Sequence, residues 1–279
     1  MTRRAAITGF PVAHSRSPLV HGHWLAEHGI DGSYEKVAVS PDAAAAFYRD
    51  FRESGLVGCN VTVPNKEAAA AACDELDEAA RAMGAANTLW LDDTGRLIGA
   101  NTDGSGFLGN LDQSLPGWDD GLSHAVVLGA GGAARAVIWA LLSRGVKTVA
   151  IVNRTYQKAA DLKARFGPDS IACHWEDLDD LMGTTGLLVN TTSLGMSGQP
   201  PLEIDLRNLS ESAIVADLVY VPLETPLLAR ARARGNPAVD GLGMLLHQAV
   251  PGFERWFGVR PRVTDELRAL VLADLGSQA

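Results

Sequence analysis

The feature that most constrains the fold is a glycine-rich segment in the middle of the chain, Gly129-Ala130-Gly131-Gly132-Ala133-Ala134. An apolar run, 125–128, precedes it, and residues 132–144 after it have the apolar spacing of a helix. The segment fits G-x-G-x-x-A, in which the first glycine allows a tight turn, the second admits a pyrophosphate and the last small residue lets helix pack on strand. This strand–turn–helix setting disfavours a merely flexible loop and predicts a doubly wound dinucleotide-binding domain.

The end of the next predicted strand, 148–152, indicates which dinucleotide is bound. An acidic residue there would hydrogen-bond the ribose 2′-hydroxyl of NAD. Here the chain continues as Asn153-Arg154-Thr155, with Lys158 one helical turn later and no acid between them. Solvated surface charges are the alternative explanation, but a guanidinium in this place can stack on adenine and pair with a 2′-phosphate. We therefore predict NADP(H) as the cofactor.

Alternating strand and helix patterns on both sides of this segment predict an α/β fold of two domains. The N-terminal part is predicted as a mixed α/β domain with a hairpin at Asp92-Asp93-Thr94-Gly95, and residues 101–106 are predicted as a turn. The predicted strands are 5–8, 33–39, 59–63, 88–91, 96–100, 125–128, 148–152, 171–174, 187–190 and 213–217. The predicted helices are 18–28, 43–54, one from 67, 75–83, 132–144, 156–165, one ending at 248 and 264–275.

The bulk composition excludes several classes of protein. The 279 residues are 47% hydrophobic and carry a net charge of −9, which argues against a general nucleic-acid binder. Cys59, Cys73 and Cys173 form no C-x-x-C pair, so reduced thiols are expected. No segment reaches the length of a membrane span and no export signal opens the chain. A cytoplasmic protein is expected.

Polar side chains gather at predicted strand ends in the N-terminal half. In Asn60-Val61-Thr62-Val63-Pro64-Asn65-Lys66, alternation places Asn60 and Thr62 on one strand face, and Pro64 ends the strand just before Lys66. Asn87 and Asp103 stand at two further strand margins, and Asp103 is the only acid in its neighbourhood. Such amides and hydroxyls suit a polyol ring, and a Lys66–Asp103 pair could handle a proton at the reacting carbon.

Two serines, Ser15 and Ser17, precede a predicted helix start. Hydroxyls at a helix N-terminus can hold a carboxylate without a fixed positive charge. Taken singly, Ser17 could be a plain helix cap, Asn87 a turn former and Lys66 a surface amine. The histidines lack carboxylate neighbours at ligand spacing, so no metal site is predicted.

Together these blocks resemble the shikimate dehydrogenase family over nearly the whole chain. The matching segments are 14–18, 60–66, 84–88, 101–104, 129–133, 153–155, 190–196, 217–220 and 240–248. The resemblance implies reversible, NADPH-linked reduction of 3-dehydroshikimate to shikimate in aromatic amino-acid biosynthesis. It also implies a substrate-binding domain of residues 1–104 plus 240–279 and a Rossmann-type NADP-binding domain of residues 105–239.

The resemblance assigns roles residue by residue. Lys66 and Asp103 would form the catalytic pair, with Lys66 either transferring the proton or stabilising charge. The substrate carboxylate would be bound by Ser15, Ser17 and Tyr220, and its hydroxyls by Asn60, Thr62, Asn87 and Gln248. The cofactor would contact Gly129, Ala130, Gly131, Gly132, Ala133, Asn153, Arg154, Thr155 and Lys158, with Leu218, Gly241, Met244 and, more weakly, Glu78 at the nicotinamide end. Asn65 departs from the family, whose members often have an aromatic residue or His there, so it could tune the pocket.

Three rival interpretations stay open at this point. A quinate/shikimate dehydrogenase of catabolic type would favour NAD and an acid in place of Arg154. An aminoshikimate dehydrogenase would share most of the motifs. A non-catalytic nucleotide-sensing module would be expected to lose Lys66 or Asp103, and both are present. We expect a monomer or homodimer acting on a small molecule.

Overall fold

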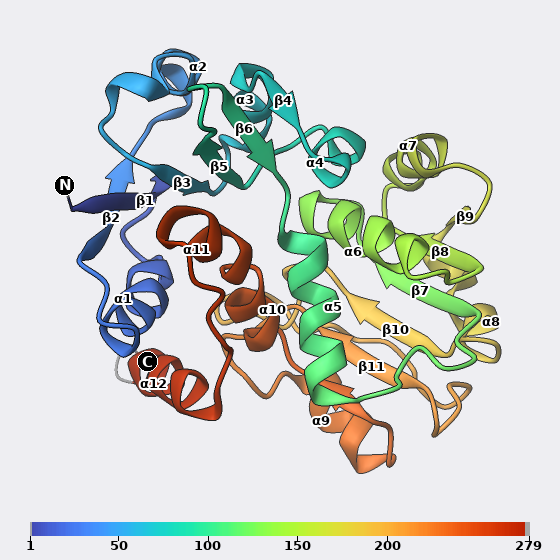
Figure 1. Cartoon of the computed structure of the whole chain (residues 1–279). Helices are drawn as coiled ribbons and strands as arrows, with labels where there is room; N and C mark the ends of the chain where they lie inside the picture. Colours follow the sequence, from blue (N-terminus) through green and yellow to red (C-terminus); the bar gives the residue numbers. More distant parts are fainter. Residues whose placement is uncertain (1, 277–279) are drawn as a thin grey trace. The chain divides into compact units, whose positions relative to one another are not determined.

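The computed structural model describes residues 2–276 and is shown in Figure 1. Contacts divide the chain into two compact units, one of residues 2–102 with 246–276 and one of Asp103–Leu245. Each unit has its own β-sheet. The predicted two-domain α/β organisation is confirmed.

The sheet of the first unit is mixed, with strand order β2-β1-β3-β5-β6-β4. Its strands are β1 (Arg3–Gly9), β2 (Gly32–Ala38), β3 (Gly58–Val61), β4 (Glu75–Leu76), β5 (Thr88–Leu91) and β6 (Leu97–Ala100). β1 runs parallel to β2 and β3, whereas β5 is antiparallel to β3 and β6. The antiparallel pair of β5 and β6 follows from the predicted Asp92–Gly95 turn, which is too short for a crossover to a parallel strand.

Helices cover both faces of this first sheet. They are α1 (Ser17–Glu27), α2 (Pro41–Arg49), α3 (Lys66–Ala72), α4 (Glu78–Met83), α11 (Val250–Phe257) and α12 (Asp265–Gly276). On one face, Cys59 and Val61 of β3 pack in a core with Tyr48 and Ala69 of α2 and α3. α11 also lies against the sheet, since Trp256 Nε1 donates to the carbonyl of Leu89 at 2.9 Å. The end of the chain therefore completes the unit that the beginning starts.

The second unit has a parallel sheet in the order β12-β11-β10-β7-β8-β9. Its strands are β7 (His124–Leu128), β8 (Thr148–Val152), β9 (Ser170–Cys173), β10 (Leu187–Asn190), β11 (Ile214–Asp217) and β12 (Ala238–Val239). Its helices are α5 (Asp103–Ser114), α6 (Gly132–Ser143), α7 (Tyr156–Phe166), α8 (Leu178–Met182) and α9 (Pro226–Ala233). The short α10 (Leu242–His247) ends the unit and leads into the first. This is the predicted doubly wound arrangement.

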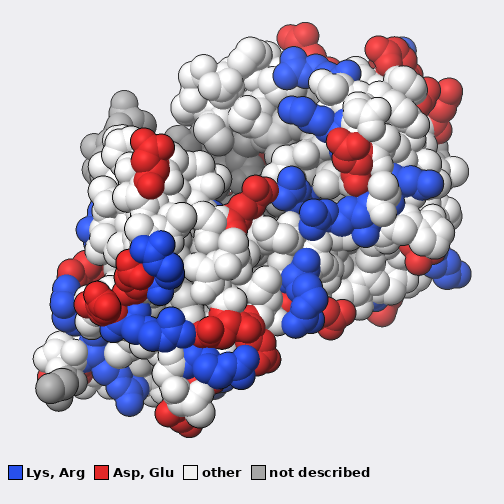
Figure 2. Space-filling model, turned by 90° about the horizontal axis from the view of Figure 1, so that it is seen from above, with Lys and Arg blue, Asp and Glu red and all other residues white. Residues whose placement is uncertain are grey.

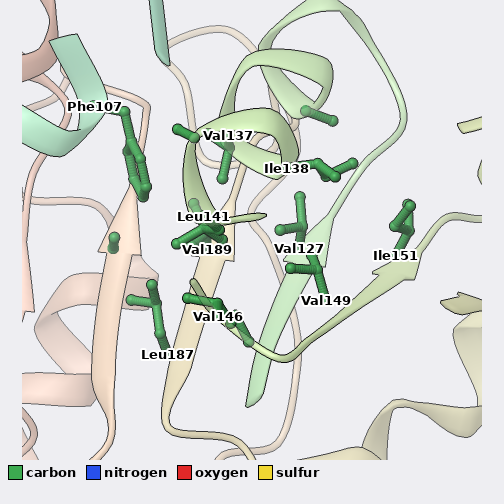
Figure 3. Packing of buried hydrophobic residues seen from close by; sticks show 14 of the residues in the cluster. Phe107, Val127, Val137, Ile138, Leu141, Val146, Val149, Ile151, Leu187 and Val189 are labelled. Atoms are coloured by element: carbon green, nitrogen blue, oxygen red, sulfur yellow. The ribbon is translucent and has the colours of Figure 1, made fainter. Parts of the chain in front are cut away.

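Strand alternation builds two cores on this parallel sheet. Val127, Val149 and Ile151 face one core with Val137 and Ile138 of α6, as Figure 3 shows. Their neighbours Val126 and Leu128 face the other core with residues of α8 and α9. Side chains on a strand alternate between the two faces of the sheet, and helices cover both faces of a parallel sheet. Both sets of side chains are therefore apolar.

Two local predictions were wrong. Residues 101–106 were predicted as a turn, but α5 begins at Asp103. Gly104 suits this helix because a Cβ there would lie 3.0 Å from the Trp139 ring, so the glycine permits close packing of α5 on α6. Residues 75–83 were predicted as one helix, but Glu75–Leu76 pairs with β6, and Asp77 caps the start of α4 by accepting from Ala80 N at 2.6 Å.

Candidate active site

A group of buried polar side chains lies at the ends of β3, β5 and β6 in the first unit, beside the half-buried Gln248. We call Asn60, Asn87, Thr88, Thr102 and Gln248 the polar cluster. The Asn87 side-chain oxygen accepts from Thr102 N at 2.9 Å and Thr88 Oγ1 at 3.0 Å, and its Nδ2 lies 3.4 Å from Gln248 Oε1. Since a backbone N–H can only donate, the atom facing Thr102 must be the oxygen. The amide nitrogen is thereby turned toward Gln248.

Asn60 supports the orientation of Asn87 and Thr88 through hydrogen bonds. Its Oδ1 accepts from the Tyr34 hydroxyl at 2.6 Å, and its Nδ2 donates to the carbonyl of Asn87 at 3.2 Å and to Thr88 Oγ1 at 3.1 Å. The side chain is 3% exposed. These contacts hold Asn87 in place, and the predicted contact of Asn60 with a substrate hydroxyl stays a prediction.

Lys66 is the first residue of α3 and is half-buried. Its carbonyl accepts from Ala86 N at 2.9 Å, which sets the start of α3 beside the residue before Asn87. Thr62, just after β3, is held by its backbone N–H to the carbonyl of Thr8 at 2.8 Å. The buried Asn65 donates from Nδ2 to the carbonyl of Val39 at 2.8 Å, so this departure from the family anchors the chain after β2.

The two serines lie where α1 begins. Ser15 is in the preceding loop and Ser17 is the first residue of the helix. The Ser15 hydroxyl accepts from Ser17 N at 3.3 Å, and among the described residues no side chain caps the helix at the preceding residue, Arg16. Helix N-termini attract anions because their first N–H groups have no helical partner.

The glycine-rich segment of the second unit borders a cavity of about 220 Å³ at the end of β7. The cavity is lined by Gly129, Ala130, Gly131, Asn153, Arg154, Trp175, Thr191, Thr192, Ser193 and Leu194. Gly129 has φ +108°, and a Cβ there would lie 2.8 Å from Thr191 Oγ1. A Cβ at Gly131 or Gly132 would meet nothing within 4 Å among the described residues. The open side of this turn faces the N-terminus of α6, which has no side-chain cap within residues 2–276, so it fits a pyrophosphate.

The predicted 2′-phosphate residues follow β8. Arg154 lines the cavity, and Asn153 donates from Nδ2 to the carbonyl of Thr155 at 2.9 Å, which fixes the turn into α7. Lys158 is exposed in the first turn of α7. The sequence interpretation missed Trp175 and the side chains of 191–194 as cavity residues. The segment 190–196 was a motif in the sequence, but nothing local marked Trp175, which reaches the cavity only through the neighbouring strand β9.

The other predicted cofactor residues follow β11 and β12. Leu218 and Gly241 are in contact, because a Cβ on Gly241 would lie 2.1 Å from the Leu218 carbonyl oxygen. The buried Asp217 organises this turn by accepting from Asn190 Nδ2, Val219 N and Thr225 Oγ1, and burial raises its pKa. Tyr220 and Met244 are half-buried in the same unit.

The two remaining predicted residues are the first residues of two helices. Glu78 is exposed at the first turn of α4 in the first unit. Asp103, the predicted partner of Lys66, is the first residue of α5 and half-buried, and it opens the second unit. Within each unit, then, most of the predicted residues lie at or just after the ends of neighbouring strands.

The residues that the structure describes form neither a metal-binding cluster nor a helix suited to a bilayer. Within residues 2–276, no group of three or more His, Cys, Asp or Glu side chains could hold a metal ion. None of the helices in this range has the length and apolar character needed to cross a bilayer. Figure 2 shows basic and acidic side chains both scattered among neutral ones on the face it presents.

Three sequence models of one family match the chain in order. The shikimate dehydrogenase substrate binding domain matches residues 7–89, the shikimate / quinate 5-dehydrogenase model residues 119–196, and the shikimate 5′-dehydrogenase C-terminal domain residues 241–271. The chain is also 57% identical to the shikimate dehydrogenase (NADP(+)) of Azorhizobium caulinodans, over 99% of this chain and 98% of the relative.

Solved structures with the same fold span the full length as well. Shikimate 5-dehydrogenase from Thermus thermophilus, in complex with NADP(H) and shikimate, is 36% identical with a TM-score of 0.84, covering 98% of this chain and 100% of that chain. Quinate dehydrogenase from Corynebacterium glutamicum, in complex with NAD, is 30% identical with a TM-score of 0.88, covering 98% and 99%. The fold therefore serves relatives with different ring substrates and different dinucleotides.

Proposed function

The chain belongs to the shikimate dehydrogenase family, and on that premise we propose that it catalyses the reversible reduction of 3-dehydroshikimate to shikimate with NADPH. It is an NADP-dependent oxidoreductase acting on a CH–OH group. One observation carries the choice of substrate and cofactor: the same chain holds a pre-oriented amide cluster suited to ring hydroxyls and a dinucleotide cavity lined by Arg154 without an acid.

The cofactor side fits NADP(H). The open turn at Gly131 and Gly132 leads onto the uncapped N-terminus of α6, which would hold the pyrophosphate. Arg154, with Asn153, Thr155 and Lys158 beside it, would hold the 2′-phosphate, and Leu218, Gly241 and Met244 the nicotinamide end. When bound, the cofactor supplies or accepts the hydride at the ring carbon.

On the substrate side, we assign the ring hydroxyls to Asn87, Gln248 and Thr62, and the carboxylate to Ser15, Ser17 and Tyr220. Asn87 presents a donor and Gln248 an acceptor, which together match one hydroxyl group. Asn60 keeps a place in the site as the support of Asn87. Residues 1–104 with 240–279 would then be the substrate-binding domain and residues 105–239 the NADP-binding domain.

Lys66 and Asp103 are proposed to handle the proton. Oxidation of shikimate transfers a hydride from the carbinol carbon to NADP⁺ and releases the proton of the hydroxyl on that carbon, giving 3-dehydroshikimate, NADPH and H⁺. An ammonium or amine at Lys66 can either exchange that proton or stabilise the charge that develops on the oxygen, and Asp103 would orient it. Both readings require Lys66 for turnover.

The first prediction tests this assignment by replacing Lys66. With shikimate and NADP⁺, followed by absorbance at the nicotinamide band, Lys66→Ala is expected to lower kcat by roughly a hundredfold or more, as expected for loss of a general acid–base. NADP⁺ affinity should stay near the native value. Lys163→Ala, which removes an exposed lysine of α7, is the control and should leave turnover unchanged.

The same assay separates the rival functions. Better turnover of quinate with NAD⁺ would favour the catabolic quinate/shikimate dehydrogenase, and turnover of an amino analogue of shikimate would favour the aminoshikimate enzyme. A Lys66→Ala variant as active as the parent would contradict the catalytic assignment. If the protein binds NADP⁺ normally but turns over no ring alcohol, the nucleotide-sensing module is the remaining interpretation.

The setting of the enzyme is also a proposal. Cys59, Cys73 and Cys173 are free thiols, which agrees with a reducing compartment such as the cytoplasm. We propose that it works there as a monomer or homodimer on a small-molecule substrate. Sedimentation of the purified protein would decide the oligomeric state.

A further inference from the structure

Three charged side chains hold the loop that carries Ser15 into α1. Lys36 of β2 donates from Nζ to the carbonyl of Ala13. Arg16 donates from Nη1 to the carbonyl of His14 and from Nε to Asp274 Oδ2 of α12 at 2.8 Å. The loop is therefore fixed from two sides, by a strand that follows it and by the last helix of the chain.

The contact between Arg16 and Asp274 is the more sheltered kind of ion pair. The Arg16 side chain is 14% exposed and Asp274 34%, whereas the Arg4–Glu35 pair of the same unit is 47% and 42% exposed. Exposed pairs contribute little because water screens them, and charge-assisted bonds strengthen as water is excluded. An interaction joining residues 16 and 274 can thus restrain the loop in a way that the exposed pair cannot.

These charged contacts matter because neither serine is fixed by regular secondary structure on its N-terminal side. Ser15 Oγ bonds only two residues ahead into the helix, to Ser17 N at 3.3 Å, among the contacts described. The direction of the Ser15 hydroxyl and the entry of the chain into α1 depend on the backbone of 13–16. Lys36 and Arg16 grip that backbone by two of its carbonyl oxygens.

We infer that Arg16, Lys36 and Asp274 are positioning residues that hold the Ser15–Ser17 segment for the substrate carboxylate. The inference rests on the proposed function. Arg16 already donates to Asp274 and to the His14 carbonyl, so its role is to shape the loop while the hydroxyls of Ser15 and Ser17 meet the anion. The helix α12 then contributes to substrate affinity through Asp274, which contacts Arg16 and not the substrate.

The test measures steady-state kinetics of Arg16→Gln, Lys36→Gln and Asp274→Ala with shikimate and NADP⁺. Arg16→Gln and Asp274→Ala are each expected to raise KM for shikimate by about tenfold, the equivalent of one charge-assisted hydrogen bond partly lost, with kcat within about twofold. Lys36→Gln should raise KM by less, because the contact of Lys36 with the Ala13 carbonyl is exposed. KM for NADP⁺ should not change. Arg16→Lys should recover part of the loss, because a lysine keeps the charge but not the two-point contact. Glu35→Gln, which breaks the exposed Arg4–Glu35 pair next to Lys36, is the matched control and should behave like the parent.

Two further arms make the result specific. Arg16→Gln combined with Asp274→Ala should raise KM no more than Arg16→Gln alone, because Asp274 acts through Arg16. With the methyl ester of shikimate, which lacks the anion, the variants and the parent should have the same KM. Thermal unfolding by circular dichroism checks that each variant is folded, and Arg16→Lys serves if Arg16→Gln is not.

The inference is overturned if KM for shikimate is unchanged in folded variants, or if kcat alone falls. A lower KM in Asp274→Ala would also overturn it, since it would show that Arg16 binds the carboxylate directly once its partner is gone. Failure of the proposed function looks different: the unaltered enzyme would not turn over shikimate with NADP⁺, and the inference would fall with it.

Discussion

Asn87 illustrates how a single side chain is given a direction by its neighbours. Its side-chain oxygen is held by Thr102 N and Thr88 Oγ1, and Asn60 donates to its backbone carbonyl. The amide cannot rotate by half a turn without placing its NH₂ against a backbone N–H. In the proposed site, Asn87 would offer a ligand hydroxyl a donor and Gln248 would offer it an acceptor, which is how a site favours one pattern of hydroxyls.

Asn87→Asp keeps the shape of this side chain and removes its donor. We expect kcat/KM for shikimate to fall by roughly ten- to a hundredfold, because a buried oxygen would face the substrate where an N–H is needed. Asn101→Asp is the matched control, since Asn101 is similarly buried and its side chain donates to the carbonyl of Ala85 at 2.9 Å. It should lower stability and leave KM unchanged; an equal rise in KM for both variants would contradict the prediction.

Arg154 is the residue that we propose to distinguish NADP(H) from NAD(H). Arg154→Ser should raise KM for NADP⁺ by about ten- to a hundredfold through loss of a guanidinium–phosphate contact, with little change for NAD⁺. Initial rates with both cofactors measure the ratio. Arg165→Ser at the far end of α7 removes the same charge outside the cavity and should leave the ratio intact. An unaltered ratio in Arg154→Ser would assign 2′-phosphate recognition elsewhere.

At the scale of elements, α5 and α6 pack closely because α5 carries glycine at the contact. A Cβ at Gly104 would lie 3.0 Å from Trp139 and 3.1 Å from the Ala136 carbonyl oxygen. A helical glycine otherwise costs about 1 kcal/mol relative to alanine, so its presence here reflects packing rather than propensity.

Replacing glycine by alanine in two helices should therefore have opposite effects. Gly104→Ala is expected to lower the free energy of unfolding by about 1–3 kcal/mol through overpacking. Gly22→Ala in α1, where a Cβ meets nothing within 4 Å among the described residues, should raise it by about 0.5–1 kcal/mol. Urea unfolding of both variants measures the difference, and stabilisation by Gly104→Ala would show that α5 can move away from α6.

At the scale of the whole molecule, stability should depend on pH through one buried histidine. His21 of α1 is fully buried and stacks on Tyr34 at 3.9 Å, and neither ring nitrogen has a hydrogen-bond partner among residues 2–276. Burial lowers its pKa from 6.5 to about 3. The unfolded chain therefore takes up a proton below pH 6.5 that the folded chain does not.

The free energy of unfolding should then fall as the pH drops from about 6 to about 4, with a share from His21 of about 1.4 kcal/mol per pH unit. His21→Phe keeps the ring stacking and removes the titration, so its curve should be flatter than that of the parent in this range. His23→Gln on the same helix is the control. Chemical unfolding at several pH values gives the slopes, and parallel slopes for His21→Phe and the parent would exclude His21 as the cause.

The sequence was informative where local chemistry and architecture coincide. Three segments could be placed between a strand and a helix from the sequence alone: the glycine-rich turn, residues 153–155 after β8, and residues 60–66. It was uninformative where a long-range contact decides. Local sequence favours a turn at Gly104, because the packing of Gly104 against α6 is a long-range contact. Trp175, Arg16 and Asp274 likewise contact segments that are far away in the sequence. The structure places Asn60 beside Asn87, but its partner Tyr34 could not be inferred from spacing.

The return of residues 246–276 to the first sheet has a consequence for synthesis on the ribosome. Trp256 seats against Gly58 and Leu89, and Trp24 donates to the carbonyl of Arg262 at 3.0 Å. The N-terminal strands emerge first yet lack these partners until residues 246–276 have been translated, whereas Asp103–Leu245 is contiguous and can fold as soon as it leaves the exit tunnel. In the nascent chain, the unit of residues 103–245 should therefore fold before the unit that contains residues 2–102. A stop codon shortly before residue 246 should leave the unit of residues 103–245 folded and should deprive the other unit of its apolar cover.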